Sequence, residues 1–217
     1  MVSVKNNNIV IVFEAYGVLI VSHAIGGYYC APLLSALLPQ LPYISVAMLS
    51  TSAISAVITT IYLVLRTNFI PSLDIRWELL SYIVAGIIVA WFATFIGLMM
   101  MDRQVPLLQE VIQEKAAYYP LNFFLIILWG PFWEEVLFRG YFFELLRKQQ
   151  SAAWALLFST TLFVLFHGIW GGFSVGLSLI FLYSVIFTLL YMEGGLIVSV
   201  SVHAFVNFYL TVLNIGW

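Results

Sequence analysis

Six polar side chains in the second half of this 217-residue chain are of types that can hydrolyse an amide bond. They lie within otherwise apolar stretches and are Glu134, Glu135, Arg139, His167, His203 and Asn207. A carboxylate beside an imidazole can take a proton from water, and a second imidazole with an amide can donate to a developing oxyanion. These residue types therefore fit attack of an activated water on a peptide bond.

The spacing of these residues separates their tasks if each lies on a helix. Glu134 and Glu135 are adjacent, so they point about 100° apart. Glu135 and Arg139 are four residues apart and can pair along one face, which leaves Glu134 to face the interior of a bundle. His203 and Asn207 have the same spacing, so both can reach one small volume.

The sequence just before Glu134 predicts a break in its helix. Gly130-Pro131 should kink the helix and free a backbone carbonyl. Inside a membrane such a break is tolerated where it lines a buried or wet cavity. No G-x-S-x-G motif is present, and the single cysteine, Cys30, lies far away in the sequence.

The composition indicates that lipid is the main solvent of the chain. Hydrophobic residues make up 63% and charged residues 8% of the sequence, and the mean hydropathy is +1.05. A soluble domain needs far more polar surface. The net charge of −2 gives no support to a nucleic-acid partner.

Apolar stretches of about 20 residues predict roughly seven membrane spans. These spans are 9–27, 43–65, 79–101, 121–146, 152–169, 172–192 and 195–213. Segment 102–119 mixes charged and apolar residues, as an amphipathic interfacial helix does. We therefore predict an all-α, polytopic transmembrane helix bundle. Residues 1–119, with the amphipathic segment, and a catalytic core at 120–217 would form a single domain.

The predicted helices place four of the polar side chains at similar depth in the bilayer. At about 1.5 Å per residue, Glu134, His167, His203 and Asn207 lie roughly 12–22 Å from one membrane face. An ionisable group at the centre of a span costs about 2.5–3.5 kcal/mol on insertion scales. Three helices that carry such groups at one level indicate a shared site.

The basic residues of the predicted loops orient the bundle. The N-terminal side carries Lys5, Arg66, Arg76, Arg147 and Lys148, whereas the other side carries Arg103 and Lys115. This bias predicts an integral, multi-pass protein of a plasma membrane with its N-terminus in the cytoplasm.

Three short motifs then give the chain a family resemblance. They are Glu134-Glu135-Val-Leu-Phe-Arg139 (EExxxR), Phe163-Val-Leu-Phe-His167 (FxxxH) and His203-Ala-Phe-Val-Asn207, a His followed four residues later by Asn. In this order on successive membrane helices, they resemble the CAAX protease and bacteriocin-processing (CPBP) family. This family of glutamate-type intramembrane proteases is also called the type II CAAX prenyl endopeptidase or Abi family. The resemblance covers about residues 120–210.

The resemblance implies a role for each matching position. Glu134 would be the general base that activates water together with His167. His203 and Asn207 would form the oxyanion hole, and the other two charged positions of the first motif would orient and support Glu134. The substrate would be a protein or peptide cut near its C-terminus, either prenylated or carrying a C-terminal sorting signal.

Two other functions remain open on the sequence alone. A membrane partner or immunity factor without enzymatic activity could keep the same fold. A transporter could use Glu134 and the histidines as a proton relay, but the polar set is confined to one half of the chain, without the matched broken helices of a transporter.

A metal is a further open question. Glu134, His167 and His203 could hold a divalent ion such as zinc. No H-E-x-x-H motif is present, and an amide oxygen is a poor zinc ligand, so a mechanism without any cofactor is favoured.

Two polar residues of the first span stand apart from this set. Glu14 and His23 are nine residues apart, which places them on opposite faces of a helix. Both are predicted to have structural or solvated roles.

Overall fold

The computed structural model describes residues 7–41, 43–74, 76–100, 119–171 and 176–212. Every regular element within these ranges is a helix. The all-α prediction is therefore confirmed. The amphipathic helix predicted at 102–119 lies outside the described residues except for its last position.

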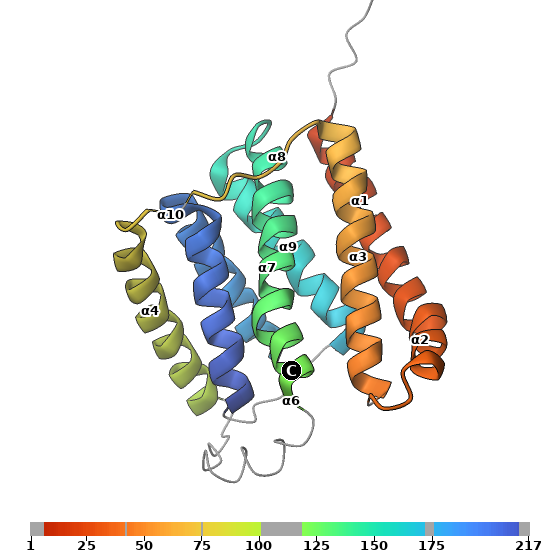
Figure 1. The fold of residues 1–217 in the computed structure, drawn as a ribbon. Helices are drawn as coiled ribbons and strands as arrows, with labels where there is room; N and C mark the ends of the chain where they lie inside the picture. The colour runs from red at the N-terminus through yellow and green to blue at the C-terminus, as the bar shows by residue number, and fades with distance from the viewer. Residues whose placement is uncertain (1–6, 42, 75, 101–118, 172–175, 213–217) are drawn as a thin grey trace, which may run out of the picture.

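Four of the described helices belong to the N-terminal half. Helix α1 (Asn8–Ile25) continues through the π-helical stretch η1 (Gly26–Cys30) into α2 (Ala31–Leu37). Helix α3 (Tyr43–Thr67) packs along α1 and η1, whereas α4 (Leu79–Met100) packs against the last helix of the chain. The first three helices and α4 consequently lie on opposite sides of the bundle (Figure 1).

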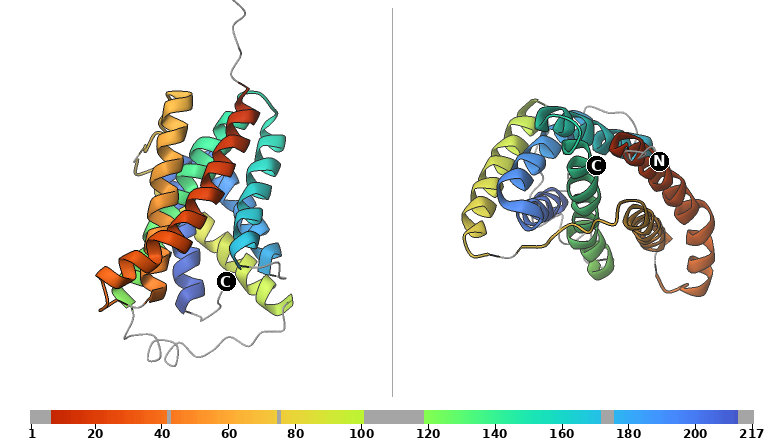
Figure 2. Two further views of the ribbon diagram at one scale, coloured as in Figure 1. Left: turned by 90° about the vertical axis from the view of Figure 1, so that its right-hand side faces the viewer. Right: turned by 90° about the horizontal axis from the view of Figure 1, so that it is seen from above.

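A helical segment with two π stretches runs from residue 119 to residue 147 through the centre of the bundle (Figure 1). Its parts are α6 (Tyr119–Phe124), η3 (Leu125–Trp129), α7 (Gly130–Glu135), η4 (Val136–Phe143) and α8 (Glu144–Arg147). Seen from above, it separates α4 and α10 from α1 and α3 (Figure 2). We call it the central segment.

Two long helices complete the bundle. They are α9 (Ala152–Gly171) and α10 (Gly176–Val212). Gly195 interrupts α10 with φ 74° and ψ −169°, a conformation that favours glycine. Phe187 and His203 lie on either side of this break and stack with ring centroids 4.5 Å apart. The chain therefore folds back at Gly195, and α10 has two arms.

The lengths of these helices confirm a membrane-spanning bundle. Five helical stretches are long and apolar enough to cross a bilayer: Asn8–Leu37, Val46–Thr67, Leu79–Gly97, Ala152–Ile169 and Leu177–Thr211. The last stretch contains the Gly195 turn and covers two predicted spans. The central segment, also predicted as a span, is divided by its π stretches. The count of seven spans remains a prediction.

Candidate active site

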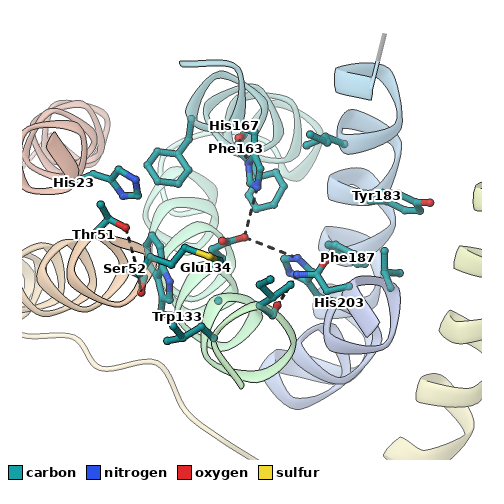
Figure 3. Close-up of a pocket in the computed structure, with 18 residues that line it drawn as sticks. His23, Thr51, Ser52, Trp133, Glu134, Phe163, His167, Tyr183, Phe187 and His203 are labelled. Atoms are coloured by element: carbon teal, nitrogen blue, oxygen red, sulfur yellow. Dashed lines mark hydrogen bonds and ion pairs between the residues drawn. The ribbon is translucent and has the colours of Figure 1, made fainter. Parts of the chain in front are cut away.

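A cavity of about 300 Å³ lies among α1, α3, the central segment, α9 and α10. Its wall includes all three histidines of the chain, which are His23, His167 and His203, together with Glu134 and Asn207. Figure 3 shows Glu134 pointing toward His167 and His203. Side chains from five separate helical elements therefore meet at one enclosed space.

Glu134 lies between two imidazoles. Its Oε2 atom is 3.9 Å from Nε2 of His167 and 3.9 Å from Nε2 of His203. These distances are too long for direct hydrogen bonds, and a separation of this size can be bridged by a water molecule. The structure thus brings Glu134, His167 and His203, three of the candidate site residues, together at one cavity.

The second glutamate belongs to a buried network. Oε1 of Glu135 accepts a hydrogen bond from Nη1 of Arg139 at 2.9 Å and contacts Nδ1 of His203 at 2.8 Å. Both Glu135 and Arg139 are fully buried. The spacing of four residues predicted the first contact, but the contact with His203 joins two distant segments and has no sequence signal.

Arg139 extends this network into the first arm of α10. Its Nη2 atom donates to the carbonyl oxygen of Ser184 at 3.0 Å and to the Ser184 hydroxyl at 2.8 Å. The guanidinium carbon also lies 4.6 Å from the centre of the Phe163 ring, a cation–π distance. Arg139 therefore connects α9, the central segment and α10.

The hydrogen-bond partners assign the tautomers of both histidines. Nδ1 of His203 faces the Glu135 carboxylate, and Nδ1 of His167 lies 2.9 Å from the carbonyl oxygen of Phe163. Both partners accept hydrogen bonds, so each Nδ1 carries the proton. In the neutral rings, Nε2 is then an acceptor that faces Glu134. His203 can donate from Nε2 only when it is doubly protonated.

Asn207 completes the helix around Pro131. In η3 the Gly130 N–H bonds to the Leu125 carbonyl, so this π-helical register would pair residue 131 with the Ile126 carbonyl. Pro131 has no N–H. Nδ2 of Asn207 donates to the Ile126 oxygen instead, at 2.9 Å. Pro131 thus frees a backbone carbonyl, as Gly130-Pro131 predicted, and one of the two N–H groups of Asn207 is committed to it.

Three further polar residues line the cavity from the N-terminal half, and the sequence analysis did not place them there. His23 of α1 and Thr51 and Ser52 of α3 lie on the side away from His203 (Figure 3). The His23 ring packs edge-on to Phe166, with centroids 5.3 Å apart. No spacing rule links residues on separate helices, so sequence reasoning could not find this group.

Glu14 lies away from the cavity. Its Oε2 atom accepts hydrogen bonds from the Tyr62 hydroxyl at 2.5 Å and from Nη2 of Arg66 at 2.9 Å. These side chains are exposed on the outside of the bundle and tie α1 to α3. The contact fits the structural role predicted for Glu14.

The site and the membrane-spanning helices define an integral membrane protein with a buried glutamate–histidine centre. Residues 116–209 match the model of a family described as type II CAAX prenyl endopeptidase Rce1-like. The match covers all three motifs, leaves α1 to α4 outside, and confirms the family resemblance found in the sequence. Residues 116–209 are therefore similar to a type II CAAX prenyl endopeptidase, and the match covers less than half of the chain. Comparisons with curated proteins and with solved structures gave no match.

Proposed function

We propose that this protein is an intramembrane endopeptidase in which Glu134 activates the attacking water. The observation that carries the proposal is the position of Oε2 of Glu134, 3.9 Å from each of two imidazole Nε2 atoms. A water beside Glu134 would have a carboxylate to take its proton and the His167 imidazole to fix its position, with His203 on the other side of the carboxylate. The family match of residues 116–209 supports peptide hydrolysis over other uses of the same groups.

The proposed reaction begins with transfer of a proton from water to Glu134. The water oxygen attacks the scissile carbonyl carbon, and His167 holds that water in place. Doubly protonated His203 and the second N–H of Asn207 donate to the carbonyl oxygen as it gains negative charge. The C–N bond then breaks, and Glu134 returns its proton to the leaving amine.

Glu135 and Arg139 act on the reaction through His203 in this proposal. The Glu135 carboxylate accepts from Nδ1 and so directs Nε2 toward the cavity. A carboxylate that orients an imidazole in this way is a common element of hydrolase sites. Arg139 holds the carboxylate in place from the other side.

The proposed substrate is a protein or peptide that is cut near its C-terminus. The matching family is described as a CAAX prenyl endopeptidase, and this description is the reason for testing a prenylated CAAX peptide. A suitable probe is therefore a farnesylated peptide with a CAAX terminus and a fluorophore separated from a quencher by the scissile bond. The same peptide without the farnesyl group tests whether prenylation is required.

Glu134→Gln tests the proposed base. The purified variant in proteoliposomes should lose about 10²–10⁴-fold in kcat, the usual contribution of a positioned general base. Glu14→Gln is the matched control, since it makes the same change outside the cavity and should cleave normally. Full turnover by Glu134→Gln would reject the assignment of the base. A biological effect that survives this variant would favour a non-enzymatic partner.

Chelation tests the cofactor prediction. Among the described residues, no group of three or more His, Cys, Asp or Glu side chains is arranged to hold a metal ion. We expect cleavage to persist after dialysis against a chelator and elemental analysis to find no bound metal in stoichiometric amount. Loss of activity on chelation, with recovery on addition of zinc, would favour a metal held by Glu134, His167 and His203.

A further inference from the structure

The cavity has a second polar wall that lies outside the segment matched by the family model. His23 of α1 and Thr51 and Ser52 of α3 form it, opposite the His203 side (Figure 3). We call these three residues the α1–α3 wall. It lies within the first 116 residues, so the family match gives it no role.

Close packing of α1 against α3 holds this wall in place. A methyl group at Gly26 would lie 2.7 Å from Cα of Thr51 and 2.8 Å from the Ser50 carbonyl oxygen. The Ser50 hydroxyl also donates to the Gly26 carbonyl at 3.1 Å. The π-helical stretch η1 begins at Gly26, and such stretches are frequent at functional sites. The Thr51 backbone is therefore fixed against α1.

Thr51 and Ser52 line the cavity, and each hydroxyl donates its hydrogen to its own helix. Oγ1 of Thr51 donates to the Ala47 carbonyl at 2.8 Å, and Oγ of Ser52 donates to the Met48 carbonyl at 2.7 Å. A hydroxyl has one hydrogen, which is used in each case by the helix itself. The remaining lone pairs can accept hydrogen bonds from a molecule in the cavity.

An extended peptide has the matching arrangement of donors. The N–H and C=O of one residue point to the same side of an extended chain, and the side alternates from residue to residue. Suppose that the scissile carbonyl faces His203 and Asn207. One residue of the peptide carries this carbonyl. The N–H groups of its two neighbours in the peptide then face the opposite wall.

We propose that Thr51 and Ser52 are positioning residues that accept hydrogen bonds from these backbone N–H groups. The proposal rests on the proposed function. In this proposal the substrate is an extended peptide that is recognised in part through its backbone. At the two positions next to the residue with the scissile carbonyl, free N–H groups then contribute more to binding than side chains do.

The test compares kinetic constants for the farnesylated CAAX peptide. Thr51→Val and Ser52→Ala should each raise KM by about two- to twelvefold, the usual worth of one hydrogen bond. Their kcat should stay within about twofold, because the lost bond serves ground and transition states alike. Thr161→Val is the matched control: Thr161 donates to the carbonyl of Leu157 in the same way, at 2.8 Å, but is exposed on α9.

A second arm changes the substrate instead of the protein. For cleavage directly after the farnesylated cysteine, N-methylation of the residue before this cysteine removes one of the two N–H groups. Methylation should raise the KM of wild type by a similar factor. It should raise the KM of the Thr51→Val/Ser52→Ala double variant only slightly. This coupling between protein and peptide changes is not expected from a purely structural role of the hydroxyls.

The outcomes separate the two proposals. Failure of wild type to cleave, or unchanged cleavage by Glu134→Gln, would reject the proposed function. Normal cleavage that depends on Glu134, with KM unchanged in both variants, would overturn only the role of the α1–α3 wall. If the variants fail to fold, an unchanged KM of wild type for the methylated peptide overturns it equally.

Discussion

His203 has each of its ring nitrogens directed to a different glutamate. Nδ1 contacts Glu135 at 2.8 Å, and Nε2 faces Glu134 at 3.9 Å. Glu135 belongs to a fully buried ion pair with Arg139, and Glu134 lines the cavity. A change at Glu135 should therefore alter both the stability of the fold and the geometry of the reaction.

Glu135→Gln should separate these two effects. The variant leaves the Arg139 charge buried without its counter-ion, which typically costs about 3–5 kcal/mol. Thermal unfolding in detergent should show a lower midpoint, and peptide cleavage should fall. In the double variant Glu135→Gln/Arg139→Met, the midpoint should recover in part while cleavage stays low, because His203 still lacks the carboxylate at Nδ1. Recovery of cleavage in the double variant would contradict the orienting role.

His23→Phe tests the only histidine of the cavity that belongs to the N-terminal half. Phenylalanine keeps an aromatic ring beside Phe166 but removes both ring nitrogens. We expect kcat within about twofold of wild type, since His23 takes no part in the proposed proton transfers, and a KM change of at most about twelvefold. The same measurement on His167→Phe should show the opposite pattern, with kcat lost.

Residue spacing predicted part of the site and missed the rest for a physical reason. The pair of Glu135 and Arg139 follows from helical geometry within one element, and the depth of Glu134 and the two histidines follows from counting along spans. Thr51 and Ser52 carry no such signal, because hydroxyl residues are common on membrane helices. Only the packing of α3 against α1 and the central segment turns them toward the cavity.

At the scale of helices, Pro131 and Asn207 act as one unit. The proline removes a backbone donor from the central segment, and the second arm of α10 supplies a replacement through Nδ2 of Asn207. The freed carbonyl was predictable from Gly130-Pro131. The π register that selects the Ile126 carbonyl was not, since it depends on how the segment packs and leaves no periodic pattern in the sequence.

A double-mutant cycle tests this unit. Asn207→Ala should destabilise the protein by about 1–3 kcal/mol, because the Ile126 carbonyl loses its partner at a partly buried position. Pro131→Ala restores a backbone N–H that can bond to this carbonyl, so the loss at Asn207 should be smaller in that background. The coupling is expected at about 0.5–3 kcal/mol from unfolding midpoints of the four proteins. Strict additivity would contradict the shared carbonyl.

Two glycines of the first membrane stretch should respond oppositely to alanine. Gly26→Ala places a methyl group 2.7 Å from the α3 backbone and should destabilise the protein by about 1–3 kcal/mol. Gly17 has no atom within 4 Å of such a methyl group. Gly17→Ala should therefore be neutral or stabilising, by up to about 1 kcal/mol, through helix propensity. Unfolding midpoints of the two variants in detergent test this difference. Equal effects of Gly26→Ala and Gly17→Ala would contradict the close contact of Gly26 with α3.

For the whole molecule, the basic residue Lys148 lies at the same end of the bundle as the start of α1. Nδ2 of Asn8 donates to the Leu145 carbonyl at 2.9 Å, and the Lys148 ammonium lies 4.5 Å from the centre of the Phe69 ring. The start of α1, the end of α8 and the segment after α3 thus lie at one end of the bundle (Figure 1). The basic residues Arg103 and Lys115, predicted for the other end, lie outside the described residues.

Cysteine labelling tests the expected cytoplasmic N-terminus. In a Cys30→Ser background, Gln150→Cys lies at the end that carries Lys148, and Gln40→Cys lies in the exposed turn after α2 at the other end. An impermeant thiol reagent added to intact cells should label position 40, and position 150 should react only after permeabilisation. The reverse pattern would place the N-terminus outside.

The sequence predicted the class of the molecule better than its assembly. Hydropathy identified the membrane bundle, and the spans proposed at 172–192 and 195–213 meet at the observed turn of Gly195. Hydropathy carries no information about which helices touch, so it did not show that α4 packs on α10 while α1 and α3 enclose the cavity. The division of the chain at residues 119 and 120 remains a prediction.

The bond between Asn207 and Ile126 also has a consequence for biosynthesis. Helix α10 follows every other described helix in the chain, so the ribosome makes its second arm after the central segment has been synthesised. Until that arm arrives, the Ile126 carbonyl has no hydrogen-bond donor, because Pro131 has no N–H and Asn207 has not yet been made. An unpaired carbonyl in hydrocarbon is costly. A nascent chain therefore lacks His203 and Asn207 until the arm that supplies the missing hydrogen bond is made, which delays activity until that arm has inserted.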